Sequence, residues 1–390
     1  MAADPGGRPR VAHRLTIKCP LVTDWSSLVV LPAPEHDPFD IGGVAEIKQR
    51  LGLDEVVKLH WNENLFGPLP GVLEAAREEL EHAWMYPEET YRAFRDEVAA
   101  FLGTTPGRVF PGHGTQALIG ALATTFLRPG DRVVVPQLTY YLYGTACAAR
   151  GAVVHEAPTR ELRIDVEALL DTVRRTRAKI VWLCDPNNPT GDMLEPGEWA
   201  YLLDQLPGSC VAVVDEAYVD FVALEARLPR LAAVEEGRPV VVLRSFSKFF
   251  GLAGLRLGYT IADAALTDRL ALVEEPYNVN CAALAAGRAC LRAGDAAEER
   301  RREVAEAREL LAAGLRDAGA EPLPAAANFV LARIGVDDRM LADELARQGL
   351  LVRPGSDVGL PGYVRITVGP VPLMRRVLAA FTDARSALEG

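Results

Sequence analysis

The sequence predicts an α/β fold built on a mainly parallel β-sheet with helices on both of its faces. Short β-branched runs alternate with helical segments from about residue 106 to residue 244. Such alternation indicates parallel strands joined by crossover helices, because a chain must cross the sheet before its next strand can pair in parallel. With 390 residues, of which 49% are hydrophobic, the chain can form two domains and bury a sizeable core.

The strands of this sheet are expected where short β-branched or apolar runs are followed by turn residues. The first run leads into a Gly-rich turn, and the others are nearly continuously apolar, as strands buried on both faces are. The expected strands are Pro106–Gly114, Arg132–Val135, Ala152–His155, Ile180–Cys184, Val211–Val214 and Val240–Leu243.

Helices are expected where apolar residues recur at intervals of three and four. Up to residue 206 these segments are Gly43–Gly52, Gly71–Ala83, Gln116–Phe126, Tyr141–Arg150, Val166–Thr176 and Glu198–Leu206. A long charged helix over Ala296–Ala318 then leads to a C-terminal α+β part. Its expected elements are strands at Phe329–Ala332, Leu350–Arg353 and Tyr363–Val368 and a last helix near Leu373–Leu388.

The composition argues against a nucleic-acid or membrane partner. The 42 basic and 53 acidic residues give a net charge of −11, which disfavours binding to a polyanion. No apolar run reaches the length of about 18 residues that a membrane-spanning helix needs, and no secretory signal follows the N-terminal arginines. The six cysteines form no C-x-x-C pair and no zinc-type cluster. We expect reduced thiols, no metal site and a soluble cytoplasmic protein.

A lysine that could form an imine follows the last strand of the sheet. Lys248 closes the segment Arg244-Ser245-Phe246-Ser247-Lys248, and Arg256 comes eight residues later. A lysine near a strand end can act as an imine-forming amine, although most lysines are simply surface charges. The two serines and Arg256 together could hold a phosphate dianion beside it.

Three further segments place polar residues where strands end, which is where ligands gather in a parallel sheet. Asp215 could pair with a protonated pyridine nitrogen, or it could cap a helix. Asn188 lies in the turn Asp185–Gly191, and its amide could donate to a phenolic oxygen. The turn Gly112–Gln116 opens a helix whose first N–H groups form an anion site. An ordinary turn explains either of the last two segments when each is taken alone.

Several other short motifs accompany these segments in a fixed order. The whole set comprises Asn62-Glu63-Asn64 with Gly67-Pro68, Tyr86-Pro87, Asp185–Gly191, Asp215–Tyr218, Ser245–Lys248 with Arg256, Pro276–Asn280, Leu351–Arg353 and Arg365–Gly369. Taken together, they resemble the fold-type I enzymes that use pyridoxal 5'-phosphate (PLP), in the class I/II aminotransferase group. Within that group the resemblance is to histidinol-phosphate aminotransferases, and it extends over about residues 38–378.

The resemblance implies two domains and a dimer. A large PLP-binding domain with a mainly parallel seven-stranded sheet would span residues 67–280. A small α+β domain would combine residues 38–66 with the linking helix and C-terminal part at residues 281–390. Residues 1–37, rich in Pro, Gly and Ala, would form a flexible arm. Tyr86 resembles a tyrosine that reaches the phosphate of the partner subunit, so a homodimer is implied.

The resemblance also implies which residues carry the chemistry. Lys248 would hold PLP as a Schiff base and later move the proton, and Asp215 would hold the pyridine nitrogen. Tyr218 and Asn188 would contact the phenolic oxygen, and Tyr140 would stack on the ring. The phosphate would be bound by Thr115, Gln116, Ser245, Ser247, Arg256 and Tyr86.

For the substrate, Arg365 would clamp the α-carboxylate through a bidentate pair. The other implied substrate contacts are Arg353, Asn64, Trp61 and Phe39. Phe39 stands where that family carries a tyrosine that contacts the substrate phosphate, and His60-Trp61 stand where small residues are common. Two acids of the family are replaced by Gln116-Ala117.

From these departures we expect an aminotransferase that uses an amino acid or amino alcohol as donor and a keto compound as acceptor. A donor that is aromatic or a specialised metabolite precursor would suit Phe39 and Trp61 better than histidinol phosphate, because their faces favour an apolar partner. A PLP-dependent decarboxylase, eliminase or cyclase on the same scaffold is the alternative, because fold does not fix function. A non-enzymatic protein of this fold is a third possibility.

Overall fold

The structure is a computed structural model that describes residues 43–223 and 228–389. The expected N-terminal arm over residues 1–37 and the predicted site residue Phe39 lie outside the described residues. The chain from Gly42 to Gly390 forms one compact unit, and everything below concerns the described part of that unit.

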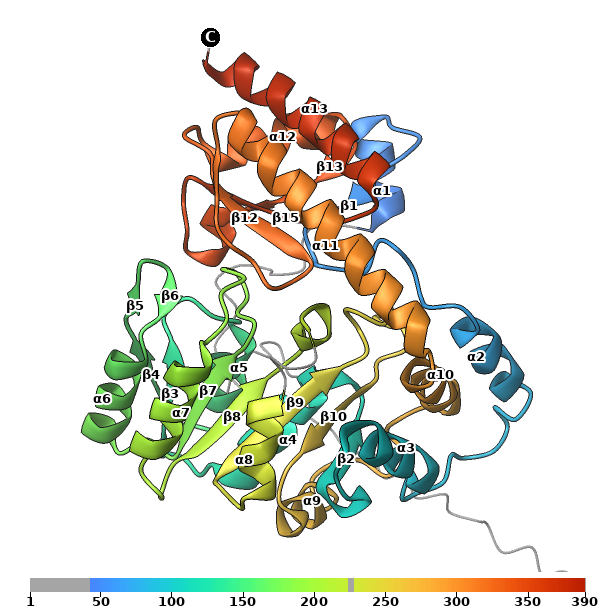
Figure 1. Cartoon of the computed structure of the whole chain (residues 1–390), viewed down its shortest axis with the longest axis vertical. Coiled ribbons are helices and arrows are strands. Elements are labelled where there is room, and N and C mark those ends of the chain that lie inside the picture. The colour runs from blue at the N-terminus through green and yellow to red at the C-terminus, as the bar shows by residue number, and fades with distance from the viewer. Residues whose placement is uncertain (1–42, 224–227, 390) are drawn as a thin grey trace, which may run out of the picture. The chain divides into compact units, whose positions relative to one another are not determined.

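A seven-stranded sheet forms the centre of the described chain (Figure 1). Its strand order is β2-β10-β9-β8-β7-β3-β4, and only β10 runs antiparallel to its neighbours. The strands are β2 (Val109–Gly112), β3 (Arg132–Pro136), β4 (Val153–Ala157), β7 (Ile180–Cys184), β8 (Val211–Asp215), β9 (Val240–Ser245) and β10 (Gly258–Ile261). The predicted α/β fold class with a mainly parallel seven-stranded sheet is thus confirmed.

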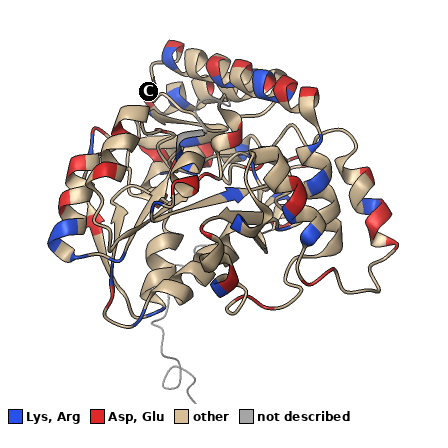
Figure 2. Ribbon diagram, turned by 60° about the horizontal axis from the view of Figure 1, so that its bottom comes forward, with Lys and Arg blue, Asp and Glu red and all other residues tan. Residues whose placement is uncertain are grey.

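Helices cover this sheet because the strands at its centre carry apolar side chains on both faces. Every residue of β7 and β9 is buried. Helix α4 packs on β9 and β10, while α6 packs on β3 and β4. The helices of this part are α2 (Val72–Leu80), α3 (Arg92–Leu102), α4 (Gly114–Phe126), α5 (Leu142–Ala148), α6 (Val166–Thr176), α7 (Pro196–Gln205), α8 (Leu228–Glu235), α9 (Ala264–Leu270) and α10 (Cys281–Leu291). The ribbon in Figure 2 is coloured for charged residues mostly on helices and loops, whereas the strands are mainly tan.

A second, smaller sheet lies in the C-terminal part, with strand order β11-β12-β15-β14 and antiparallel pairing throughout. Its strands are β11 (Glu321–Pro322), β12 (Phe329–Arg333), β14 (Arg353–Pro354) and β15 (Tyr363–Thr367). The helices around it are α11 (Gly294–Asp317), α12 (Asp338–Arg347) and α13 (Val371–Glu389). Helix α11 runs from the end of α10 to the small sheet (Figure 1). Among the described residues, no helix is long and apolar enough to cross a membrane.

One expected strand is divided in the structure. Residues Leu350–Leu351 form β13, which pairs in parallel with β1 (Val57–Lys58), whereas Arg353–Pro354 form β14 and pair with β15. The single strand expected over Leu350–Arg353 was therefore wrong. The residues before Val352 pair with β1 and the residues after it pair with β15. A local sequence pattern does not reveal this change of partner. The pairing of β1 with β13 anchors the segment after helix α1 (Val44–Leu51) to the C-terminal part.

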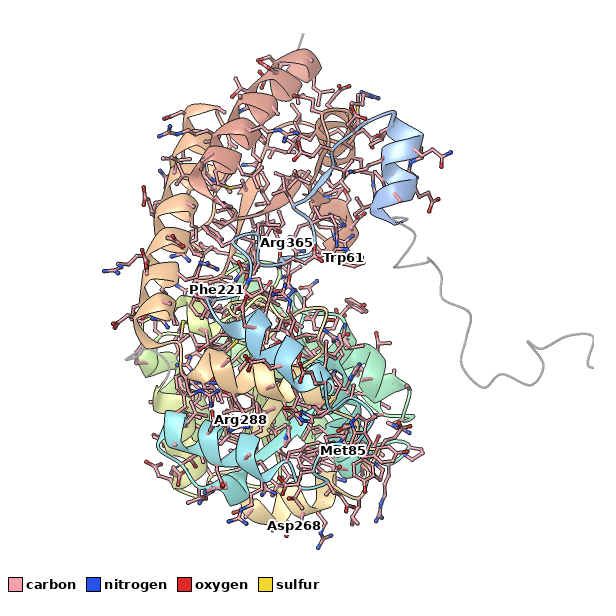
Figure 3. All side chains as sticks on the ribbon, turned by 90° about the vertical axis from the view of Figure 1, so that its right-hand side faces the viewer. Trp61, Met85, Phe221, Asp268, Arg288 and Arg365 are labelled. Carbon is pink, nitrogen blue, oxygen red and sulfur yellow. The ribbon has the colours of Figure 1, made fainter. Side chains whose placement is uncertain are left out.

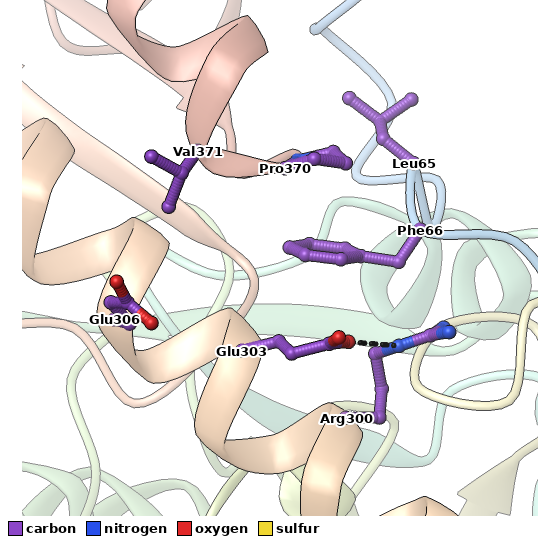
Figure 4. A pocket seen from close by; sticks show the side chains of 7 residues that line it. All are labelled: Leu65, Phe66, Arg300, Glu303, Glu306, Pro370 and Val371. Carbon is purple, nitrogen blue, oxygen red and sulfur yellow. Dashed lines mark hydrogen bonds and ion pairs between the residues drawn. The ribbon is translucent and has the colours of Figure 1, made fainter.

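An open cavity of about 520 Å³ lies where α11 meets the start of α13 and the loop before α2 (Figure 4). Apolar side chains of Leu65, Phe66 and Val371 face Glu303 and Arg300 of α11 across it. Arg300 is engaged by the carbonyl of Gly67 and by the Glu303 carboxylate. The residues that line this cavity include none of the predicted site residues, so the cavity is not the candidate site.

Candidate active site

The carboxyl ends of three neighbouring strands meet at one edge of the central sheet. Cys184 at the end of β7 pairs with Asp215 at the end of β8, which pairs with Leu243 of β9. The polar segments that follow these strands therefore lie side by side. The order of strands also reverses beside β3, which pairs with both β4 and β7. Ligands bind at such a switch point, outside the carboxyl ends of the strands.

Lys248 lies three residues beyond the end of β9, and its ammonium group is tied to the segment before α2. Its Nζ donates to the carbonyl of Trp61 at 2.9 Å and lies 5.8 Å from the centre of the Tyr218 ring. Burial, reinforced by the positive charge of Arg365, lowers the pKa of Lys248 to about 8. Both effects disfavour the charged amine. A larger neutral fraction makes this lysine a better nucleophile near neutral pH than a surface lysine.

Asp215 is a buried carboxylate at the end of β8. The Tyr143 hydroxyl donates to Oδ2 at 2.9 Å, and the backbone N–H of Ala217 donates to Oδ1 at 3.0 Å. Burial raises the pKa of Asp215 to about 6. The bond to Ala217 is the local turn contact expected of a capping aspartate, so the structural interpretation also holds. The Asp215 side chain is only 3% exposed at the edge of the sheet. Its carboxylate also offers a negative charge to a bound cation.

An anion-binding group of donors forms around Arg256. Its Nη1 donates to the Ser247 hydroxyl at 3.5 Å and its Nη2 donates to Oε1 of Gln116 at 3.2 Å. The Ser245 hydroxyl accepts from the backbone N–H of Ser247 at 3.1 Å. Thr115 and Gln116 lie in the first turn of α4, where backbone N–H groups lack helical partners and attract anions. Predicted phosphate ligands from three segments are thus brought together.

Close backbone approach is what allows this group to assemble. A Cβ on Gly258 would lie 2.9 Å from the backbone nitrogen of Thr115, and one on Gly114 would lie 2.6 Å from Nη2 of Arg256. Only glycine lets β10 and the guanidinium come so near the start of α4. Arg256 itself has a φ of 57°, a left-handed conformation that is costly for a residue other than glycine and clusters at functional sites.

Gln116 links this donor group to the next predicted residue. Its Nε2 donates to the Tyr140 hydroxyl at 2.9 Å while its Oε1 accepts from Arg256. Tyr140 follows β3 and stands beside Tyr143, with ring centroids 5.5 Å apart at 82°. Burial raises the pKa of Tyr140 to about 12, so its hydroxyl is neutral. Gln116, which replaces an acid of the resembled family, thus makes two side-chain contacts here.

Arg365 and Asn188 meet beside these residues. Nη1 of Arg365 donates to Oδ1 of Asn188, and Nη2 donates to the carbonyl of His60 at 2.7 Å. This leaves the Asn188 amide to donate elsewhere. Arg365 is only 5% exposed, and its Nε has no hydrogen-bond partner among the described residues. Burial lowers the pKa of Arg365 to about 10, so it stays a cation at neutral pH. Arg365 and Trp61 are labelled in Figure 3.

A buried ion pair holds the turn that contains Asn188. Arg230 on α8 contacts the carboxylate of Asp185, and both side chains are 1% exposed. Nη2 of Arg230 also donates to the carbonyl of Leu194 at 3.3 Å, and its guanidinium lies 5.2 Å from the Trp199 ring. A charge in such a place must be paired, because an isolated buried ion is very unfavourable.

The sequence interpretation missed two buried residues of the site. Nδ2 of Asn62 donates to the Tyr218 hydroxyl at 3.0 Å, and the Asn62 backbone N–H donates to Thr367 at 3.1 Å. Tyr143 holds Asp215, as described above. The signals were present: Asn62 opens the Asn-Glu-Asn motif, and Tyr143 follows Tyr140 by three residues in the first turn of a helix. Neither signal indicates a partner so distant in the sequence.

Four predicted residues are less closely tied to this centre. Nδ2 of Asn64 donates to the carbonyl of Phe249 at 2.5 Å, while its Oδ1 accepts from the N–H of Phe66 at 2.9 Å, so both ends of its amide hold backbone. Trp61 is 41% exposed, and the Lys58 ammonium lies 4.9 Å from its ring. Tyr86 is 83% exposed and stacks on Tyr277. Arg353 makes an ion pair with Asp357 at 3.3 Å.

Comparison with known proteins identifies the family. The sequence pattern of the family "Aminotransferase class I and II" matches residues 54–381. The chain belongs to the class I and II aminotransferases. A histidinol-phosphate aminotransferase of Anaeromyxobacter sp. is 38% identical to this aminotransferase over 341 residues, which cover 86% of this chain and 93% of that protein.

Solved structures agree with this assignment. A crystal structure of histidinol-phosphate aminotransferase from Sinorhizobium meliloti in complex with PLP has a TM-score of 0.83 and 27% identity, covering 92% of this aminotransferase and 96% of that chain. Aspartate aminotransferase of Thermus thermophilus with maleate has a TM-score of 0.71 at 24% identity, covering 87% and 94%, which shows the shared fold alone. The predictions of family, enzyme class and PLP as cofactor are confirmed.

The side chains of the aminotransferase fit PLP. The cofactor needs an amine, a buried anion for its ring nitrogen and a cluster of donors for a phosphate dianion. Lys248, Asp215 and the group around Arg256 offer these three in one place. Arg256 and the hydroxyls of Ser245 and Ser247 provide the donors that a phosphate dianion prefers.

Proposed function

We propose that the enzyme transfers the amino group of an anionic amino donor, with Arg353 and Arg365 binding the anionic group of that donor. The observation that carries this proposal is the register of the small sheet, in which Arg353 pairs directly with Arg365. Like charges opposite each other across strands are unfavourable. Each of these arginines also has a buried Nε without a hydrogen-bond partner among the described residues. An anion between them would give each Nε an acceptor and would offset the charge of Arg365, whereas Arg353 also has Asp357 as a partner.

When bound, PLP would supply a carbonyl group for the donor's amino group and an electron-accepting ring. Lys248 provides the amine that holds the cofactor between turnovers and then moves the proton released from Cα. Asp215 would hold the protonated ring nitrogen, because its carboxylate offers a negative charge in a buried place. In this proposal, Tyr218 and the amide nitrogen of Asn188 would donate hydrogen bonds to the phenolic oxygen, and Tyr140 would lie against the ring.

We further propose that the donor carries an aromatic or bulky apolar side chain rather than the side chain of histidinol phosphate. Trp61 supports this, because its indole is 41% exposed next to the segment that binds Lys248 and Arg365. Desolvating an exposed indole favours an apolar partner, with aromatic pairs contributing about 0.5–1.5 kcal/mol beyond area burial. Phe39, which lies outside the described residues, adds no hydroxyl for a substrate phosphate.

A substrate comparison tests this proposal. We would measure kcat/KM of the holoenzyme for phenylalanine, tyrosine, a basic amino acid and histidinol phosphate, following the keto product. We expect phenylalanine or tyrosine to exceed the other two donors by at least about tenfold, and Trp61→Ala to remove that advantage. A matched variant, Tyr201→Ala, changes an exposed aromatic residue on α7 and should leave the ranking of donors unchanged. Preference for histidinol phosphate by more than about tenfold would overturn the substrate assignment.

Histidinol phosphate is the second candidate donor, and two observations favour it. The relatives described above are named as histidinol-phosphate aminotransferases. Two arginines paired across strands also suit a phosphate dianion, which carries more charge than a carboxylate. The same comparison decides between the two donors, because it measures kcat/KM of the holoenzyme for both.

We also propose a homodimer, in which the loop that follows α2 meets a second copy. Trp84, Tyr86 and Leu272 are each more than 80% exposed, which is unusual for large apolar side chains unless they mark an interface. The ring centroids of Tyr86 and Tyr277 lie 4.7 Å apart, so two segments join in one aromatic contact; Figure 3 labels Met85, which precedes Tyr86 in the sequence. Light scattering tests this proposal, and a monomer that is fully active at nanomolar concentration would contradict it.

The domain division and the location of the enzyme complete the proposal. A large domain over residues 67–280 contains the whole central sheet, and residues 281–390 contain the small one. Residues 38–66 are assigned to the small domain because β1 pairs with β13. The cytoplasmic location stays a prediction from cysteine usage, and the five described cysteines are free thiols.

A further inference from the structure

The Asp215 carboxylate has one hydrogen-bond donor on each oxygen. The backbone N–H of Ala217 holds Oδ1 at 3.0 Å, and the hydroxyl of Tyr143 holds Oδ2 at 2.9 Å. A carboxylate accepts hydrogen bonds only, so the tyrosine must be the donor. The backbone contact comes from the next turn of the same segment. Tyr143 is therefore the side chain that sets the rotation of the carboxylate from another element of the fold.

Tyr143 is itself held rigidly. It is fully buried in the first turn of α5, and its ring stacks on that of Trp182 in β7, with centroids 5.1 Å apart and planes 8° apart. Tyr140 contacts its edge. Such packing leaves the hydroxyl one position, directed at Asp215. Burial also raises the pKa of Tyr143 well above its ordinary value, so the hydroxyl keeps the proton that it donates.

The other titratable groups around Asp215 leave Tyr143 as its main neutral donor. Burial raises the pKa values of the Cys184 thiol on β7 and of the Tyr140 and Tyr218 hydroxyls, so all three are uncharged at neutral pH. Lys248 is the nearby cation, and its charge favours the ionised carboxylate. Because the amine of Lys248 is used for binding the cofactor, it is not a constant partner of Asp215. The hydroxyl of Tyr143 is such a constant partner.

We propose that Tyr143 is a positioning residue that orients the Asp215 carboxylate and keeps it ionised for the ring nitrogen of the cofactor. Tyr143 does not touch the cofactor in this proposal but acts through Asp215. The inference rests on the role proposed for Asp215 above. A purely structural tyrosine that fills space against Trp182 would work equally well as phenylalanine, and this difference makes the proposal testable.

The test compares two ligands of the apoenzyme: PLP and its carbocyclic analogue, in which C–H replaces the ring nitrogen. The ratio of their dissociation constants, measured by fluorescence titration, reports the contact of the ring nitrogen and not catalysis. We expect Tyr143→Phe to lower the preference for PLP about tenfold, with the affinity for the analogue changed less than threefold. When the pH is lowered, the Tyr143→Phe variant should also lose its preference for PLP at a higher pH than the unsubstituted enzyme does. The reason is that the Asp215 carboxylate takes up a proton more readily when the tyrosine hydroxyl is absent.

Two reference variants make the outcomes distinct. Tyr91→Phe removes another buried hydroxyl, which donates to Asn278 at 3.0 Å, and should leave the preference unchanged. Asp215→Asn should abolish the preference. The role of Tyr143 would be overturned if the ratio of the two dissociation constants were unchanged in Tyr143→Phe, even if both ligands bound more weakly by the same factor. If Asp215→Asn keeps the full preference for PLP, the role proposed for Asp215 fails instead.

Discussion

Arg353 and Arg365 are paired across the neighbouring antiparallel strands β14 and β15, and the second of them reaches the carbonyl of His60 and the amide of Asn188. The small sheet thus places a second positive charge beside Arg365, the proposed carboxylate-binding arginine. The Asp357 carboxylate partly offsets the repulsion between these like charges, because it pairs with Arg353 at 3.3 Å. In the proposed function, a bound substrate anion would offset the remainder.

The fork-like shape of Arg365 should matter more than its charge. We expect Arg365→Lys to raise KM for carboxylate donors about ten- to a hundredfold with little change in PLP affinity, because lysine cannot bind a carboxylate with two parallel bonds. Steady-state kinetics with a cofactor titration measures this effect. Arg333→Lys replaces an exposed arginine of β12 and serves as the control. An unchanged KM for every donor would show that Arg365 is only structural.

Removing the amine of Lys248 should abolish turnover without unfolding the protein. Unsubstituted enzyme should be yellow and form a covalent link to PLP that borohydride makes permanent, and Lys248→Ala should lose both properties. Lys179→Ala, at an ion pair with Asp131, should keep them. Peptide mapping after reduction is the measurement, and a label on a lysine other than Lys248 would refute the assignment.

Capture of PLP by the apoenzyme should depend on pH through Lys248. The pKa of this lysine is lowered to about 8. As the pH rises toward 8, the fraction of Lys248 in the reactive neutral form therefore increases about tenfold per pH unit, and above pH 8 it levels off. Stopped-flow absorbance at several pH values gives the midpoint. An ordinary lysine would titrate near 10.4, and a midpoint there would mean that neither burial nor Arg365 affects the amine.

An acid at position 116 should weaken phosphate binding. Gln116 contacts Arg256 through Oε1, so Gln116→Glu would place a negative charge beside the main cation of the phosphate-binding group. We expect inorganic phosphate and PLP to bind the apoenzyme about tenfold more weakly. Gln205→Glu is a matched control, because Gln205 accepts from Arg174 at 3.0 Å on the surface of α7. Equal phosphate affinities in the two variants would contradict the prediction.

Removing one partner of the buried ion pair between Arg230 and Asp185 should lower the free energy of unfolding much more than replacing both partners. Arg230→Met leaves a buried carboxylate without its cation, which we expect to lower the free energy of unfolding by about 3–5 kcal/mol. Adding Asp185→Asn should restore most of that loss, because the uncompensated charge is then removed. Urea unfolding of both single variants and the double variant gives the coupling energy. Additive losses would mean that the two side chains act independently.

The large elements could be predicted because their signals are local. Strand β7 and helix α6 have the bounds expected from the sequence, since one is a continuous apolar run and the other begins at Asp165, whose side chain accepts from the N–H of Ala168 at 3.1 Å. Strand β10 was missed because it is four residues long, begins at a glycine and pairs antiparallel with both neighbours. Its pairing depends on partners that no local window contains.

The site could be predicted in part for the same reason. Lys248, Asp215 and Asn188 follow strands whose ends can be identified in the sequence, and parallel strands end at a common edge. The contacts of Asn62 with Tyr218 and of Tyr143 with Asp215 join residues 156 and 72 positions apart. No pattern of spacing encodes such pairs. The position of Tyr86 in a dimer and the contribution of Phe39 stay predictions.

Two successive peptide groups connect Arg365, the proposed substrate-binding arginine, to the amine of Lys248. The carbonyl of His60 accepts from Arg365, and the next carbonyl, that of Trp61, accepts from Lys248. The charge of Arg365 also lowers the proton affinity of Lys248. Thermodynamic linkage makes this effect reciprocal: an anion that neutralises Arg365 favours protonation of Lys248, and a protonated Lys248 strengthens anion binding by the same factor. A carboxylate inhibitor should therefore bind the apoenzyme together with a proton.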